Sequence, residues 1–106
     1  MARLQAHAAI FAALGDGTRL LLVTKLADGR PYSISQLTRG SKLTRQAITK
    51  HLRVLKRAGI VHSARAGRER RFAFNPQPIQ EMKQYLERVS EQWDDALGRL
   101  KAFVEK

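Results

Sequence analysis

The period at which apolar residues recur changes abruptly near residue 60, and this change constrains the fold more than any other feature. Up to that point the apolar residues follow the three- to four-residue spacing of amphipathic helices. From Ile60 to Asn75 the spacing is two, with Phe72 and Phe74 on one face and a turn at Gly67-Arg68, which predicts one β-hairpin. Helical spacing then returns from about residue 78 to 104. The expected fold is mainly α (α+β), with five helices and one hairpin.

Four helices are predicted before the hairpin. The first, over 1–14, places four apolar residues on one side: Leu4, Ala8, Phe11 and Leu14. Asp16 is a plausible N-cap for a second helix ending near Ala27, with Leu20, Val23 and Leu26 or their neighbours inward. Ser33 or Ser35 is expected to cap a short third helix, and Thr44 a fourth that ends at Ala58, before Gly59.

The short third helix, the "RGSK" turn and the fourth helix together predict a helix-turn-helix over 33–58. The hairpin over 60–75 follows directly and makes it a winged helix-turn-helix. A chain of 106 residues has the size of one ordinary domain, so residues 1–106 are interpreted as a single unit that ends in a long helix over 78–104.

Positive charge is confined to the middle of the chain. From Arg30 to Arg71 there are twelve Lys and Arg residues and one acidic residue, Glu69, while the net charge of the whole chain is +11. The remainder is therefore electrically neutral. Charge spread for solubility would not be so confined, and a localised basic segment indicates a polyanionic partner.

The fourth helix divides into an apolar face and a basic polar face. At about 100° per residue, Ile48, Leu52 and Leu55 share a narrow arc that is expected to face the core. The opposite side mixes cations with Gln and Thr, which suits contacts to phosphates and base edges in a major groove. A basic hairpin tip suits the minor groove or the flanking backbone. The predicted DNA contacts are Thr44, Arg45, Gln46, Thr49, Lys50, His51, Arg53 and Arg57 in the helix, and Arg65, Arg68 and Arg70 in the hairpin.

Four consecutive blocks resemble the signature of the ArsR family of winged-helix repressors: "FAALGDGTRLLLVTKLADG", "YSISQLT", "LTRQAITKHLRVLKRAGIV" and "GRERRFAFNP". The resemblance extends from about Ile10 to Pro76, and the long final helix fits it. It implies a homodimeric bacterial transcriptional repressor that leaves its operator on a signal. His51 lies where the family often has a histidine near DNA.

Two positions depart from the family pattern. Founding members sense metals through cysteines where this chain has Ser33 and Ser35, and serine is a poor ligand for soft metals. The last helix has no histidine, so no metal site or cofactor is predicted, although a scattered or intersubunit metal site stays open. Gly17 stands where the family commonly has proline, which predicts a small loss of stability.

The final helix would be roughly 40 Å long, whereas a compact domain of this size has a radius of gyration of about 13 Å. Its apolar stripe nevertheless continues to the end of the helix, so we expect another surface to bury it. The simplest such surface is the same helix in a second copy of the chain. If the two copies form a two-fold dimer, the operator is expected to be an inverted repeat. The predicted dimer interface comprises Leu4, Phe11, Leu86, Val89, Trp93, Leu97, Leu100 and Val104.

Other functions have weaker support. Binding of duplex DNA without sequence preference, or of RNA, stays open, but no exposed aromatic platform for single strands is evident. No catalytic motif is present, so an enzyme is not expected. No signal peptide or membrane span is recognised, and the expected location is the cytoplasm, with the nucleoid. An unidentified small-molecule inducer, a protein partner or no signal at all would each fit.

Overall fold

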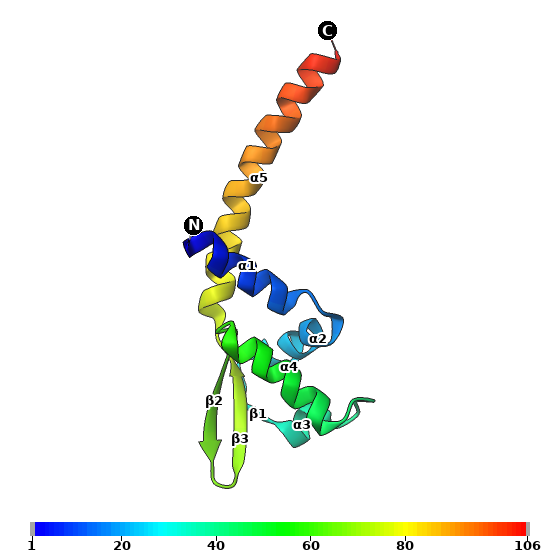
Figure 1. Cartoon of the computed structure of the whole chain (residues 1–106), viewed down its shortest axis with the longest axis vertical. Helices are drawn as coiled ribbons and strands as arrows, with labels where there is room; N and C mark the ends of the chain where they lie inside the picture. Colours follow the sequence, from blue (N-terminus) through cyan, green and yellow to red (C-terminus); the bar gives the residue numbers. More distant parts are fainter. Residues whose placement is uncertain (1, 106) are drawn as a thin grey trace.

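Five helices and a three-stranded antiparallel sheet form the chain in this computed structural model, which describes residues 2–105 (Figure 1). The elements in chain order are α1 (Ala2–Leu14), α2 (Gly17–Leu26), β1 (Tyr32–Ser33), α3 (Ile34–Thr38), α4 (Arg45–Arg57), β2 (Val61–Ala66), β3 (Glu69–Phe74) and α5 (Pro76–Val104). The predicted fold class, five helices with a hairpin wing, is confirmed.

Short polar side chains start the three middle helices, α2, α3 and α4. The carboxylate of Asp16 and the hydroxyl of Thr44 each accept a hydrogen bond from the backbone N–H three residues further on, at 3.0 and 3.1 Å. Ser33, rather than Ser35, caps α3. Its hydroxyl accepts from the backbone of Gln36, whose side-chain oxygen accepts from the backbone of Ser33 in return, so that the pair forms a capping box.

The strand β1 was not predicted from the sequence. It pairs antiparallel with β3, with Tyr32 opposite Phe72 and Ser33 opposite Arg71, and the strand order is β1-β3-β2. Two residues are too few to show a periodic pattern, so only the tertiary pairing reveals this strand. Because Ser33 also caps α3, the pairing fixes the start of α3 to the middle of β3 in the wing.

The hairpin has the predicted two-residue loop. Ala66 pairs with Glu69, and Gly67 between them has a φ of 66°, a left-handed conformation that glycine adopts without steric cost. The strand β3 begins one residue earlier than predicted, at Glu69 instead of Arg70, and Phe72 on its inner face is buried.

The core lies between α2, α3, α4 and the base of the wing. Its fully buried large side chains are Leu26, Leu37, Ile48, Leu52, Leu55, Ile60 and Val61. Of the residues expected inward, Leu26 is buried and Val23 is half-buried, whereas Leu20 is 49% exposed and the neighbouring Leu22 is buried instead. The run of three leucines in α2 is apolar at every position, so spacing could not decide which of them faces the core.

The helix α5 begins at Pro76, two residues earlier than predicted, with Asn75 as its N-cap. Figure 1 shows the second half of α5 projecting away from the other elements. The principal extents are 67 × 29 × 23 Å and the Cα radius of gyration is 18.1 Å, well above the roughly 13 Å of a compact chain of this length. As predicted, the helix extends beyond its own core.

No single helix among residues 2–105 has both the length and the apolar composition to cross a membrane. The helices α1 and α2 taken together would satisfy both conditions, but a bend of 95° separates them. Each of them contributes buried residues, such as Ile10 and Leu22, to the core of the domain.

Candidate nucleic-acid interface

The helix α4 is anchored by its apolar stripe and presents its other face to solvent. Ile48, Leu52 and Leu55 are each at most 1% exposed, which confirms the predicted inward arc. They belong to the same core cluster as Leu22 and Leu37, from α2 and α3. Burial of three large side chains holds α4 in a fixed orientation, so the position of its outer face is fixed as well.

That outer face is a shallow concavity of about 550 Å³, lined by Arg45, Gln46, Thr49, Lys50 and Arg53. All five are predicted DNA contacts, and the structure brings them together on one surface. The guanidinium of Arg45 donates to the hydroxyl of Ser35 at 2.6 Å, which links α4 to α3. The hydroxyl of Thr49 donates to the carbonyl of Arg45 at 2.7 Å.

His51 and Arg57 do not line this concavity. The imidazole Nδ1 of His51 lies 3.4 Å from a guanidinium nitrogen of Arg19 and 3.7 Å from the carboxylate of Asp16. His51 therefore contacts the start of α2, a contact that could not be predicted from the sequence. Arg57 lines a separate hollow between α1 and α4, and Thr44 is the exposed cap of α4.

Asp16 and Arg19 form the centre of this second contact. The backbone N–H of Arg19 donates to Asp16 and holds the pKa of that carboxyl below its usual value, and the positive charge of Arg19 acts in the same direction. The guanidinium of Arg19 donates to the carbonyl of Ala13, at 2.6 Å, and also reaches His51. The end of α1, the start of α2 and the middle of α4 therefore meet at one arginine, which sequence reasoning did not identify as important.

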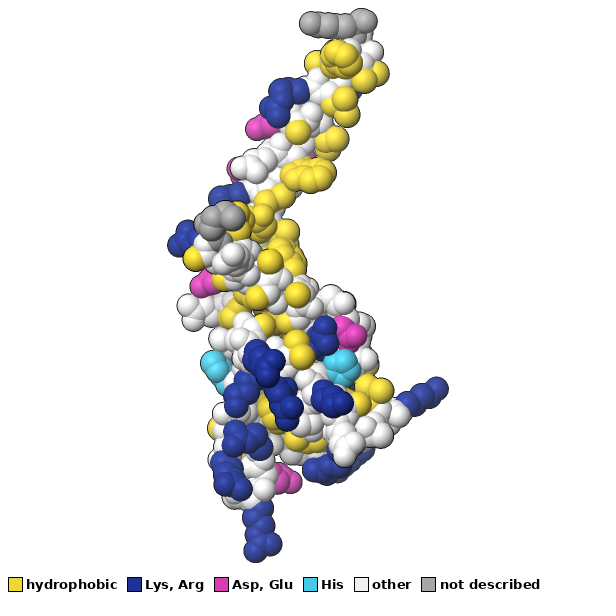
Figure 2. Space-filling view, viewed as in Figure 1, with side chains coloured by type: hydrophobic (Ala, Val, Ile, Leu, Met, Phe, Trp, Pro, Cys, Tyr) yellow, Lys and Arg dark blue, Asp and Glu magenta, His cyan; other side chains and the backbone are white. Residues whose placement is uncertain are grey.

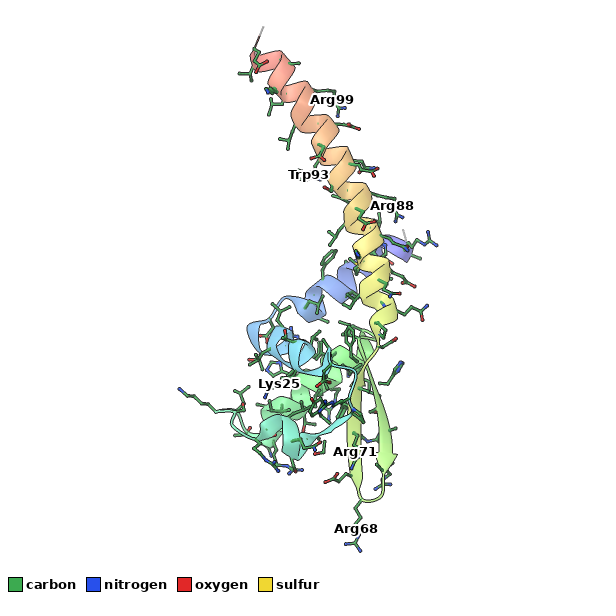
Figure 3. The ribbon with its side chains drawn as sticks, turned by 180° about the vertical axis from the view of Figure 1, so that it is seen from behind. Lys25, Arg68, Arg71, Arg88, Trp93 and Arg99 are labelled. Carbon is green, nitrogen blue, oxygen red and sulfur yellow. The ribbon has the colours of Figure 1, made fainter. Side chains whose placement is uncertain are left out.

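The predicted wing residues Arg65, Arg68 and Arg70 are all exposed on β2, β3 and the loop between them. Figure 3 shows Arg68 at the tip, extending away from the rest of the molecule. Arg65 and Arg70 are directly opposite each other across the two strands, an arrangement in which like charges destabilise a sheet. Arg70 donates to the hydroxyl of Ser63 at 3.0 Å. The hairpin therefore maintains a repulsive pair that an anionic partner would relieve.

The two basic elements form one surface. Figure 2 shows Lys and Arg side chains gathered over α4 and along the wing, whereas apolar side chains follow the projecting part of α5. The acidic side chain of Glu69 pairs with the guanidinium of Arg71, at 3.7 Å. A cationic ridge formed by one helix and one hairpin has the shape and charge that duplex DNA requires.

The second exposed surface is apolar and follows α5. The side chain of Trp93 is 65% exposed, and the other predicted interface residues Leu4, Phe11, Leu86, Leu97, Leu100 and Val104 are exposed as well, while Val89 is half-buried. Phe103, which was not predicted, is also exposed. Where α1 meets α5, Phe11, Leu14 and Leu86 line an apolar hollow of about 540 Å³.

Within residues 2–105 no group of three or more His, Cys, Asp or Glu side chains is arranged to hold a metal ion. Ser33 and Ser35, the two serines considered above as possible metal-site positions, form other contacts here. Ser33 caps α3, and Ser35 accepts the hydrogen bond from Arg45.

Residues 16–63, from the N-cap of α2 to the first half of β2, match a family described as "Bacterial regulatory protein, arsR family". The transcriptional regulator YuzN of Bacillus subtilis (strain 168), itself uncharacterized, is 41% identical over 80 residues, which are 70% of this chain and 87% of that protein. This chain belongs to the ArsR family.

Two further relatives of this ArsR-family protein are similar over most of their length. The HTH-type transcriptional regulator Rv2034 of Mycobacterium tuberculosis is 36% identical, over 80% of this chain and 76% of that protein. The structure of an ArsR-like transcriptional regulator from Rhodococcus sp. RHA1 covers 97% of this chain and 96% of its own, with 35% identity and a TM-score of 0.82. The ArsR-family protein is therefore a transcriptional regulator with a DNA-binding helix-turn-helix, and not an enzyme.

Proposed function

We propose that this ArsR-family regulator is a homodimeric repressor that binds an inverted-repeat operator and acts in the cytoplasm, at the nucleoid. The observation that carries the proposal is the exposed face of α4. Its concavity combines three cations with Gln46 and Thr49, and no acidic residue lies anywhere in α4. A face of this kind attracts phosphates and also carries side chains that distinguish bases.

The contacts divide into two kinds. The N-terminal half of such a helix usually reads bases in a major groove. In α4 this half carries four of the proposed contacts, which reach base edges or adjacent phosphates: Arg45, Gln46, Thr49 and Lys50. Arg53 and Arg57 lie further along and contact mainly phosphates. The wing residues Arg65, Arg68 and Arg70 follow the minor groove or the flanking backbone.

His51 and Thr44 have different parts in this arrangement. His51 contacts Asp16 and Arg19 in the free chain, so its effect on DNA is to hold α4 at the correct angle. Thr44 caps α4 with its side chain, and the N-terminus of a helix is itself a favourable place for a phosphate.

The second copy covers the apolar face of α5. Exposed apolar side chains continue along α5 from Leu86 to Val104, and α1 adds Leu4 and Phe11 beside them. Burial of such side chains is the main driving force of most protein association. A two-fold dimer presents two α4 helices, and half-sites about 34–36 Å apart place them in successive major grooves.

Repression follows from occupancy, because a dimer bound across a promoter excludes polymerase. An inducing signal would act by altering the relation between the two α4 helices. A small molecule held between the long helices is one such signal, and release without any ligand is the alternative.

The test is a competition gel-shift assay on the full chain, with DNA selected from a random pool against unselected duplex of equal length. If each subunit neutralises about four phosphates, the logarithm of affinity falls with the logarithm of salt with a slope of about −7. Sedimentation should give the mass of a dimer. A slope close to about −1, or equal affinity for selected and random DNA, would contradict the proposal of sequence-specific binding.

A further inference from the structure

A polar cavity lies between α1 and α5, away from the apolar stripe. It has a volume of about 270 Å³ and is lined by Arg3 and His7 of α1 and by Glu81, Gln84 and Arg88 of α5. Figure 3 shows Arg88 and Trp93 on opposite sides of α5. The cavity therefore belongs neither to the cationic ridge nor to the proposed dimer face.

The lining is rich in hydrogen-bond donors and in positive charge. The guanidinium groups of Arg3 and Arg88 carry five N–H donors each, and Gln84 has two more. Among residues 2–105 neither arginine has a carboxylate within 4.0 Å, and neither side chain forms a hydrogen bond to another residue. Glu81 is the one carboxylate in the lining, so its single charge cannot balance both arginines.

His7 adds an independent observation. Its side chain is only 8% exposed, and its Nδ1 atom is buried without a hydrogen-bond partner among the described residues. The imidazole ring lies 4.6 Å from the ring of Tyr85, measured between centroids. Buried polar atoms in native proteins nearly always have a hydrogen-bond partner, so His7 adds to the lining of this cavity a polar atom that no other described residue engages.

We propose that this cavity binds a small phosphate-type oxyanion, which bridges Arg3 and Arg88 and so ties α1 to α5. Oxygen atoms of such an anion accept paired N–H bonds from guanidinium groups, the strong form of charge-assisted hydrogen bond. Gln84 supplies a further donor. Glu81 repels a fully deprotonated anion but accepts a hydrogen bond from one that retains an O–H group, so hydrogenphosphate and dihydrogenphosphate fit better than sulfate.

The proposed anion site does not depend on the proposed function. The effect of the bound anion on regulation does depend on that function. Both α1 and α5 contribute to the proposed dimer face, so an anion that fixes one against the other should strengthen the dimer. Because the site is on the other side of α5 from Trp93, the anion would act without entering the interface.

Calorimetry on the full chain tests the site, with inorganic phosphate and sulfate titrated at equal ionic strength in sodium chloride. We expect saturable binding of phosphate and weaker binding of sulfate. Arg88→Gln should reduce phosphate affinity about tenfold or more, the usual effect of losing one hydrogen bond to a charged group. Glu81→Gln should reduce the difference between the affinities for phosphate and for sulfate.

Two control variants make the result specific. Arg99 lies on the same side of α5 as Arg88 (Figure 3) but outside the cavity, so Arg99→Gln should leave phosphate binding unchanged. Arg53→Gln on the cationic ridge should also leave it unchanged. If Arg53→Gln and Arg88→Gln weaken phosphate binding equally, or if phosphate does not bind saturably, the proposed site is wrong. This conclusion holds whether or not the chain dimerises or binds DNA.

Discussion

Single polar side chains decide where the helices of this domain begin and how they are held together. Asp16, Ser33 and Thr44 each satisfy a backbone N–H that would otherwise lack a partner at a helix start. Ser33 has a second function, because its backbone pairs with β3. It therefore couples the start of the helix-turn-helix to the wing, although Ser33 itself is buried.

Replacement of Ser33 by alanine removes the accepting half of the capping box. We expect a loss of stability of about 1 kcal/mol, the usual cost of an N-cap change, which thermal or denaturant unfolding would measure. Ser35→Ala is the matched control, since Ser35 is exposed, caps nothing and loses only an exposed hydrogen bond from Arg45. Equal destabilisation by the two changes would contradict the assignment of Ser33 as the cap.

The lowered pKa of Asp16 predicts a dependence of stability on acid. The Arg19 backbone hydrogen bond lowers this pKa in the folded chain, so the unfolded state binds the proton more readily than the folded one. The contribution is fully present above the unfolded pKa of about 3.9 and is lost as pH falls through the lower folded value.

Asp16→Asn tests this dependence, because asparagine also caps helices but carries no charge. Between about pH 5 and pH 3, the variant should lose less of its thermal stability than the unchanged chain does. Identical acid dependence of the two proteins would show that Asp16 contributes no charge-dependent stability.

The two elements that form the cationic ridge differ in how they carry charge. The cations of α4 lie on one face of a helix whose other face is anchored in the core, so the burial of that apolar face offsets the repulsion between neighbouring like charges. In the wing, Arg65 and Arg70 face each other across a two-stranded ribbon. The wing therefore favours an anionic partner at the expense of its own stability.

Arg65→Thr should make the free protein more stable and its DNA complex weaker. The change removes like-charge repulsion from Arg70 and introduces a residue that favours strands, which is worth roughly 0.2–1 kcal/mol. The same change removes a phosphate contact and should make the salt slope shallower by about one per subunit. Thermal unfolding without DNA and salt-dependent shift assays measure the two effects, and a loss of stability in the free protein would contradict the repulsion argument.

Within α4 we expect two replacements on the same face to have different effects. Arg53→Ala should weaken binding to all duplexes by a similar factor, because a phosphate contact carries no base preference. Gln46→Ala should relax the preference at one base pair per half-site, by roughly 1–3 kcal/mol of discrimination. Affinities for a set of single-substitution operators would distinguish the two, and similar profiles for both variants would refute this division of contacts.

At the scale of the whole molecule, the dominant feature is a long helix that its own domain cannot cover. Met82 is the one buried residue of α5, whereas Trp93 and the apolar residues beyond it are exposed. Exposure of such a stripe to water is unfavourable, and in the proposed dimer a second copy of α5 covers it over the same length. The polar cavity on the other side of α5 is positioned to influence that pairing.

Leu97→Glu should convert the proposed dimer to a monomer and abolish tight binding to the proposed operator. Burial of one leucine contributes about 1.5–3 kcal/mol, and the two-fold symmetry removes it twice. Analytical ultracentrifugation measures the mass, with Asp95→Asn on the solvent side of the same helix turn as control. An unchanged mass for Leu97→Glu would show that the apolar stripe is not the interface.

Much of this fold could be predicted from the sequence, because local physical rules apply to long periodic segments. The helix-turn-helix, the wing with its loop and the basic outer face of α4 follow from spacing, caps and charge. The short strand β1 could not be predicted, since two residues carry no period. The inward residue of α2 could not be chosen either, because Leu20, Leu21 and Leu22 are chemically equivalent and only packing separates them.

The sequence by itself determined the order of elements, the position of the positive charge and the length of the apolar stripe on α5, which exceeds what its own domain can bury. Each of these depends on residues that are close together in the chain. Tertiary structure alone decided which distant side chains meet. Arg19 joins three helices, His51 faces α2 instead of the outer face of α4, and Arg3 comes to lie beside Arg88 at one cavity. Contacts of this kind depend on how helices cross, and crossing geometry is set by the packing of the whole core.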